Sequence, residues 1–87
     1  MAVLVKMNVP GMTEKDYDDV SGKLTEPIRK ATGFTFHAGN VTKDGVTVTE
    51  VWATRENFNN WFTTSVQPNV KGISTPEITE LRRTVSP

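Results

Sequence analysis

The chain has 87 residues, and its ten Lys and Arg balance ten Asp and Glu, so its formal net charge is zero. It has no cysteine and one histidine, which excludes a disulfide framework and argues against a structural zinc site. A chain of this length buries only about 60–65% of the surface that its unfolded form exposes, so we expect self-association to supplement its stability.

The charge pattern argues against nucleic acid as a partner, because no basic cluster is present to meet a phosphate backbone. The only adjacent arginines, Arg82 and Arg83, are expected to be a solvated strand end. No apolar run approaches the roughly 20 residues of a membrane span, and residues 1–9 lack the cationic start of a signal peptide. We therefore expect neither nucleic acid nor membrane as a partner, and a cytoplasmic location.

The N-terminal third predicts a strand followed by a helix. Residues 2–9 alternate apolar and polar side chains and stop at Pro10-Gly11, a turn signal. Thr13 then resembles an N-cap, with Asp16 in the place of a capping-box acid. Helical spacing supports a helix over 13–25, which Pro27 should disturb in its last turn.

A β-hairpin is predicted next, with strands over 34–41 and 46–53 and Asp44-Gly45 as the turn signal. A two-residue turn at Asp44-Gly45 pairs His37 with Trp52, whereas a four-residue loop pairs His37 with Glu50. Both registers divide the side chains between the same two faces of the sheet. One face is expected to carry His37, Gly39, Val48, Glu50 and Trp52, and the other to carry Phe34, Phe36, Thr49 and Val51.

The last third predicts a second helix over 54–71 and a final strand over 77–85. Thr54 can cap the helix, an aromatic-rich stripe lies along it, and Pro68 should kink it near Thr64. The element order is therefore βαββαβ, a ferredoxin-like α+β layout in which a four-stranded antiparallel sheet carries two helices on one face.

The segment EVWATRENFNNWF, residues 50–62, resembles the dimeric α/β-barrel superfamily and its antibiotic-biosynthesis-monooxygenase-like group. The shared pattern is a strand ending in Glu-x-Trp, a Ser/Thr cap with acidic residues, and an aromatic-rich helix. HAGNVTKDG resembles the preceding hairpin of small uncharacterised members. The resemblance covers about residues 2–85 and implies that residues 1–87 form one dimeric α/β-barrel domain, with a homodimer joined sheet to sheet.

The resemblance implies a ligand site between the sheet and the helices, but the haem-degrading members differ from this chain. They use an Asn on the first strand, a Trp on the second helix and a His beyond it. Asn8 and Trp61 have the matching types, whereas Lys71 stands at the position of that His. We therefore expect no haem, no metal and no other cofactor.

His37 and Glu50 are the candidate catalytic residues, because a carboxylate beside an imidazole fixes its tautomer, as a general base requires. Gly39 beside them should leave open space. The alternative is a hydrogen-bonded histidine in a packed interior. Candidate substrate-binding residues are Trp61, Tyr17, Trp52 and Phe58, although packing in the core also explains the spacing of the aromatic side chains.

Three functions remain open. The first is a cofactor-independent monooxygenase acting on an aromatic or quinone-type compound, in which His37 abstracts a proton and Trp61 and Tyr17 hold the ring. The second is a non-catalytic binding or assembly module, and the third is an isomerase or cyclase using the same pocket. The enzymatic readings predict a cavity of roughly a few hundred cubic ångströms beside His37.

Overall fold

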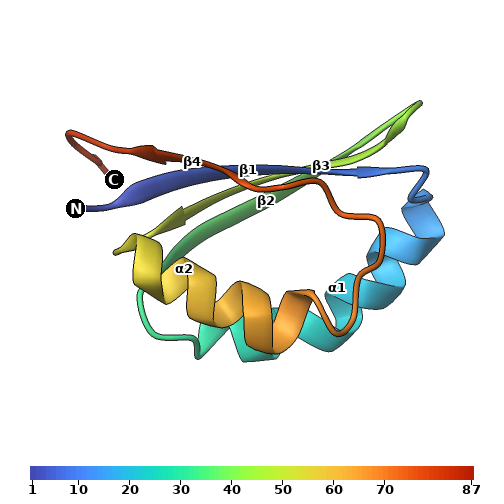
Figure 1. Ribbon diagram of the computed structural model, residues 1–87, viewed down its shortest axis with the longest axis horizontal. Coiled ribbons are helices and arrows are strands. Elements are labelled where there is room, and N and C mark those ends of the chain that lie inside the picture. Colours follow the sequence, from blue (N-terminus) through green and yellow to red (C-terminus); the bar gives the residue numbers. More distant parts are fainter.

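The computed structural model describes all 87 residues as two layers, a four-stranded antiparallel sheet and a pair of helices on one of its faces (Figure 1). The strand order is β2-β3-β1-β4. The elements in chain order are β1 (Val3–Pro10), α1 (Glu14–Arg29), β2 (Phe34–Thr42), β3 (Gly45–Trp52), α2 (Arg55–Trp61), the π-helical turn η1 (Phe62–Val66) and β4 (Glu77–Glu80). This βαββαβ arrangement confirms the predicted fold class.

Helix α1 begins as the sequence predicted. The Thr13 side chain accepts from the Asp16 amide and the Asp16 side chain accepts from the Thr13 amide, which completes a capping box. The helix continues to Arg29 with Pro27 inside it, so the expected end at residue 25 was too early. Ile28 is buried in the core, and this burial holds the last turn against the sheet despite the missing proline N–H.

The hairpin has the register that pairs His37 with Glu50. The loop is shorter than the four residues expected for that register, because Thr42 pairs with Gly45 and only Lys43 and Asp44 lie between the strands. Gly45 has a φ of +146°, a conformation that glycine adopts at little cost.

A β-bulge in β2 changes one predicted face. Phe34 pairs with Trp52 but Phe36 pairs with Val51, so Thr35 is an extra residue between them. Phe34 therefore turns to the helix-covered face, where its ring lies 5.5 Å from that of Trp52. The prediction that Phe34 shares a face with Phe36 was wrong, because strict alternation fails at a bulge.

The second helix is shorter than predicted. It widens into η1, where the Gln67 N–H donates to the Phe62 carbonyl, and it ends at Val66 instead of continuing as a kinked helix to residue 71. Pro68 has no N–H to extend the ladder, and the side-chain amide of Asn69 donates to the Ser65 carbonyl at 2.7 Å. The irregularity predicted near Thr64 is thus a π-helical turn followed by a stop.

Strand β4 is also shorter than the expected 77–85. It pairs with β1 from Lys6↔Glu77 to Val3↔Glu80, and the Leu81 N–H then reaches the Ala2 carbonyl. β4 runs toward the start of β1, so it has no partner backbone beyond that point.

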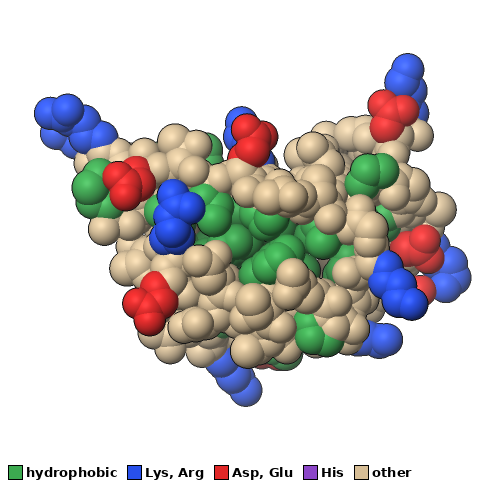
Figure 2. All heavy atoms as spheres, viewed as in Figure 1, with side chains coloured by type: hydrophobic (Ala, Val, Ile, Leu, Met, Phe, Trp, Pro, Cys, Tyr) green, Lys and Arg blue, Asp and Glu red, His purple; other side chains and the backbone are tan.

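The hydrophobic core fills the space between the sheet and the helices. Every second residue of β1 is buried on this face, whereas Lys6 and Asn8 point to the open face. The thirteen core residues are Val3, Val5, Met7, Val9, Ile28, Val46, Val48, Trp52, Phe58, Trp61, Phe62, Val66 and Val70. Figure 2 shows apolar side chains at the centre of the side view, where the layer between sheet and helices reaches the surface.

Candidate functional site

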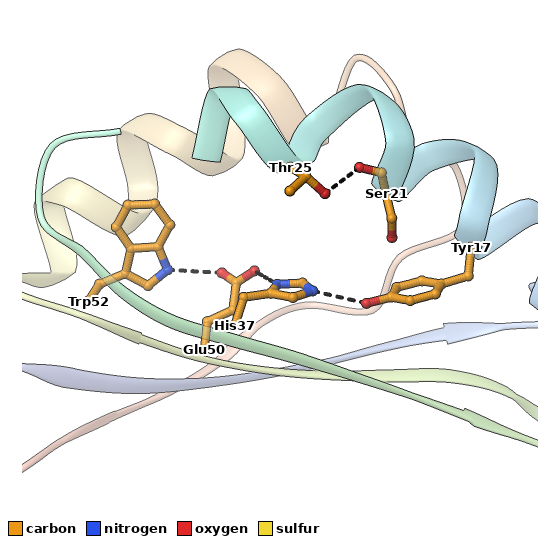
Figure 3. A network of polar contacts seen from close by, with 6 residues as sticks. All are labelled: Tyr17, Ser21, Thr25, His37, Glu50 and Trp52. Carbon is orange, nitrogen blue, oxygen red and sulfur yellow. Dashed lines mark hydrogen bonds and ion pairs between the residues drawn. The ribbon is translucent and has the colours of Figure 1, made fainter. Parts of the chain in front are cut away.

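Four side chains form a continuous line of hydrogen bonds beneath α1, which we call the polar chain: Tyr17, His37, Glu50 and Trp52 (Figure 3). The Tyr17 hydroxyl lies 3.0 Å from Nε2 of His37, and Nδ1 of His37 lies 2.7 Å from Oε2 of Glu50. The indole N–H of Trp52 donates to Oε1 of Glu50 at 2.9 Å. The expected contact between His37 and Glu50 is thus present.

The partners in the polar chain define the direction of each bond. A carboxylate oxygen accepts, so Nδ1 of His37 carries the proton that it donates to Glu50. Nε2 then has the free lone pair, which accepts the Tyr17 hydroxyl. In this tautomer every hydrogen-bonding group of the polar chain has a partner. No buried side-chain nitrogen or oxygen in the protein lacks a hydrogen-bond partner.

Burial differs sharply along the polar chain. The Glu50 side chain is only 3% exposed, whereas that of His37 is 32% exposed. Strand β3 runs through the interior of the sheet and β2 forms its edge, so adjacent positions on one face have different access to solvent. A buried carboxylate therefore orients an imidazole that solvent and small molecules can reach.

A cavity of about 90 Å³ lies between α1, the sheet and η1. Its walls are mostly apolar, and its polar lining includes Tyr17, His37, Glu50 and Ser21. The volume is below the few hundred cubic ångströms that the enzymatic alternatives predict and below the roughly 300–1,000 Å³ of typical ligand pockets. The cavity has the predicted position, but its size does not favour the enzymatic alternatives.

The space beside Gly39 is occupied, contrary to the expectation that it would be open. A Cβ atom at this position would collide with the hydroxyl and the ring edge of Tyr17. Gly39 therefore allows Tyr17 to lie against the strand and to reach His37, a relation between two distant residues that sequence spacing does not reveal.

The predicted substrate-binding residues divide into two groups. Tyr17 and Trp61 line the cavity, whereas Trp52 and Phe58 are completely buried and do not line it. Phe58 packs at 6.1 Å from the Trp52 ring, edge to face, in the core. Trp52 does not reach the cavity and contributes to the site only through the hydrogen bond that it donates to Glu50.

Sequence reasoning missed two cavity residues on α1, Ser21 and Thr25. The Thr25 hydroxyl donates to the Ser21 carbonyl at 2.6 Å, and the Ser21 hydroxyl points from the helix towards the polar chain (Figure 3). The spacing from Tyr17 to Ser21 to Thr25 is four residues each, which places all three on one helical face and was a usable signal.

Two residues, Asn8 and Trp61, have the types found in the haem-degrading members, but they do not lie in one site. Asn8 lies on the open face of the sheet, where its side chain accepts from the Thr47 hydroxyl, while Trp61 lines the cavity on the other face. No group of three or more His, Cys, Asp or Glu side chains is arranged to hold a metal ion. Neither helix combines the length and the apolar character that a membrane span requires.

Comparison with solved structures finds the same fold in several oxygenases and monooxygenases. The cofactor-independent oxygenase SnoaB from Streptomyces nogalater superposes with a TM-score of 0.67 at 15% identity, over 97% of this chain and 95% of SnoaB. A putative antibiotic biosynthesis monooxygenase from Chloroflexus aurantiacus J-10-fl gives 0.69 at 16% identity, over 99% and 98% of the two chains. The monooxygenase from the gene ActVA-Orf6 of Streptomyces coelicolor, solved with nanaomycin D, gives 0.61 at 17% identity, over 99% and 91%.

These matches confirm the predicted likeness to antibiotic biosynthesis monooxygenases at the level of the fold and nearly over the full chain. No protein-family model matches the sequence, and no curated protein matches it either. At these identities the likeness establishes the βαββαβ fold of the chain, and the chemistry has to be argued from the site.

Proposed function

We propose that the protein is a cofactor-independent, monooxygenase-like enzyme that acts on an aromatic or quinone-type small molecule. The observation that carries this proposal is the 2.7 Å bond between His37 and the buried Glu50 in the wall of an apolar cavity. Glu50 fixes the tautomer in which Nε2 carries the lone pair that a general base needs, and in this structure that lone pair accepts the Tyr17 hydroxyl. Solved proteins with this fold include a cofactor-independent oxygenase, which supports the reaction class.

In this mechanism Nε2 of His37 takes a proton from a phenol or an activated methylene group of the substrate. The resulting electron-rich anion reacts with dioxygen, which is the oxidant. For a methylene group the balanced change converts CH₂ to C=O, consuming one O₂ and releasing one H₂O. Trp61, the last residue of α2, supports the ring from the helix side of the cavity. Glu50 stabilises the protonated imidazole between proton uptake and release.

A second candidate is a non-catalytic binding or assembly module. The small size of the cavity favours it, and so does the Tyr17 hydroxyl, which already occupies Nε2 of His37. The third candidate, an isomerase or cyclase, would use the same base and would need no oxygen.

Oxygen uptake separates the three candidates. Purified protein is mixed with a panel of anthrones and hydroquinones in an oxygen electrode, and the products are compared under air and under argon. The proposal predicts protein-dependent oxygen consumption, and an anthrone should gain one carbonyl group per O₂ consumed. Product formation under argon identifies an isomerase or cyclase, and binding without any product identifies the binding module.

We also propose that the protein is a homodimer joined through the open face of the sheet. Phe36 is 50% exposed there, and the partly buried Leu4 and Val51 lie on neighbouring strands of the same face. An apolar patch of this kind on a small domain favours association.

The homodimer is tested by light scattering of two matched variants on one strand. Phe36→Lys places a charge in the proposed interface, so we expect a monomer. Val41→Lys changes another exposed apolar residue of β2 that faces the helix side, and this variant should remain dimeric. A wild-type protein that is monomeric at micromolar concentration contradicts the proposal.

A further inference from the structure

The phenol side chain of Tyr17 occupies a small site of its own. Its hydroxyl lies 3.0 Å from Nε2 of His37, and its hydroxyl and ring edge fill the space that the absent side chain of Gly39 leaves on β2. Figure 3 shows the ring reaching from α1 to the imidazole along the sheet. The protein thus holds a phenol at the atom that the proposed mechanism assigns to the substrate.

The surroundings of this ring suit a free phenol as well as they suit Tyr17. Nε2 of His37 supplies an acceptor for a hydroxyl group, and the glycine backbone provides a flat surface without a side chain. Beyond the ring the cavity continues between apolar walls, with Val48 and Leu24 in its lining. Tyr17 makes one side-chain hydrogen bond and is only partly buried, so a single interaction besides packing retains it.

We propose that Tyr17 is a displaceable occupant of a phenol subsite, and that a single-ring phenol binds by taking its place and donating its hydroxyl to Nε2 of His37. This inference rests on the proposed function and names its substrate class. It also resolves two difficulties of that function, because movement of Tyr17 frees Nε2 and enlarges the cavity by the volume of a phenol ring.

Competition with an internal occupant has a measurable consequence. The apparent affinity for an added ligand falls by the fraction of molecules in which the site is free. If Tyr17 leaves the subsite in about 1–10% of molecules, its removal strengthens the binding of a phenol by about 10- to 100-fold. Tyr17→Phe, which keeps the ring and loses the hydroxyl, is expected to lie between wild type and Tyr17→Ala.

The test is a calorimetric titration with p-cresol, which copies the tyrosine side chain, and with toluene, which lacks the hydroxyl. The chain has one tyrosine and one histidine, so NMR signals of Tyr17 and His37 are unambiguous. We expect wild type to prefer p-cresol to toluene, and we expect saturation to move the Tyr17 ring signals to those of an exposed tyrosine. p-Cresol affinity should rise in the order wild type, Tyr17→Phe, Tyr17→Ala.

Glycine variants provide the matched control. In the Tyr17→Ala background, Gly39→Ala places a methyl group in the subsite and should abolish the preference for p-cresol. Gly22→Ala adds the same methyl group on α1, where nothing lies within 4 Å of it, and should leave binding unchanged.

Two results overturn the inference and leave the proposed enzyme in place: weaker p-cresol binding in Tyr17→Ala, which makes Tyr17 a fixed wall, or Tyr17 signals that stay unchanged at saturation. Equal affinity for p-cresol and toluene in every variant also overturns it. If no variant binds either aromatic compound and no oxygen is consumed with any substrate, the proposed function fails as well.

Discussion

The two helices cover two different kinds of interior. Beneath α2 and η1 lies an aromatic cluster, in which Phe58 packs 6.1 Å from Trp52 and 5.5 Å from Phe62, and all three are buried. Beneath α1 lies the polar chain, in which the His37 side chain is 32% exposed and borders a cavity. The first region holds the layers together by packing, and the second exposes a reactive group at a point that packing does not close.

Trp52 belongs to both regions. Its ring is part of the aromatic cluster, while its N–H binds the carboxylate that orients His37. The rigid region thus positions the open one, which is the arrangement a functional site needs if its groups are to be held in place without being buried.

The largest loss of folding stability is expected from a substitution that creates a cavity in the aromatic cluster. Phe58→Ala removes a completely buried ring, and such changes cost about 3–5 kcal/mol of folding stability. We expect chemical denaturation to show this loss. A cost below about 1 kcal/mol, within the range of ordinary surface changes, would mean that α2 does not hold the sheet through this cluster.

A smaller loss of folding stability is expected from a substitution at Trp52, where the two regions meet. Trp52→Phe keeps an aromatic ring but removes the donor to Oε1 of Glu50, and an unsatisfied buried acceptor costs about 1–3 kcal/mol. The double variant with Glu50→Leu, which has no acceptor, measures the coupling of the two residues. Additive losses would show that the bond between them contributes nothing to stability.

The smallest changes in folding stability are expected when two glycines are each replaced by alanine. Gly39→Ala forces Tyr17 away from His37 and should cost about 1 kcal/mol, the net value of one hydrogen bond. Gly22→Ala in α1 should instead stabilise by up to about 1 kcal/mol, because alanine favours a helix. Thermal melts of the two variants that shift in the same direction would contradict the contact between Gly39 and Tyr17.

Local signals in the sequence were sufficient to predict most of the helices and strands of the fold. Alternation in β1, the capping box at Thr13 and the turn before Gly45 each depend on neighbouring residues, so they could be recognised directly. The errors arose where the outcome depends on distant partners. β4 stops because β1 ends, and Phe34 changes face because Thr35 forms a bulge against β3.

The part of the site that depends on neighbouring strands could be predicted from the sequence, whereas the part that depends on distant residues could not. His37 and Glu50 lie on two strands of one hairpin, so both of the registers considered placed them on one face, and the structure shows that they pair directly. Tyr17 reaches them from α1 because Gly39, on another element, has no side chain. That contact depends on how the helix packs on the sheet, and spacing along the chain does not determine it.

The most direct test of the proposed chemistry compares oxygen uptake by wild type and His37→Gln on a substrate that the panel identifies. Removing a general base lowers turnover by about 10²–10⁴-fold, and we expect a loss in this range in a variant that remains folded by circular dichroism. Stability alone does not decide the question, because the change also removes a partner of the buried Glu50. A folded His37→Gln protein that consumes oxygen at the wild-type rate would contradict the account.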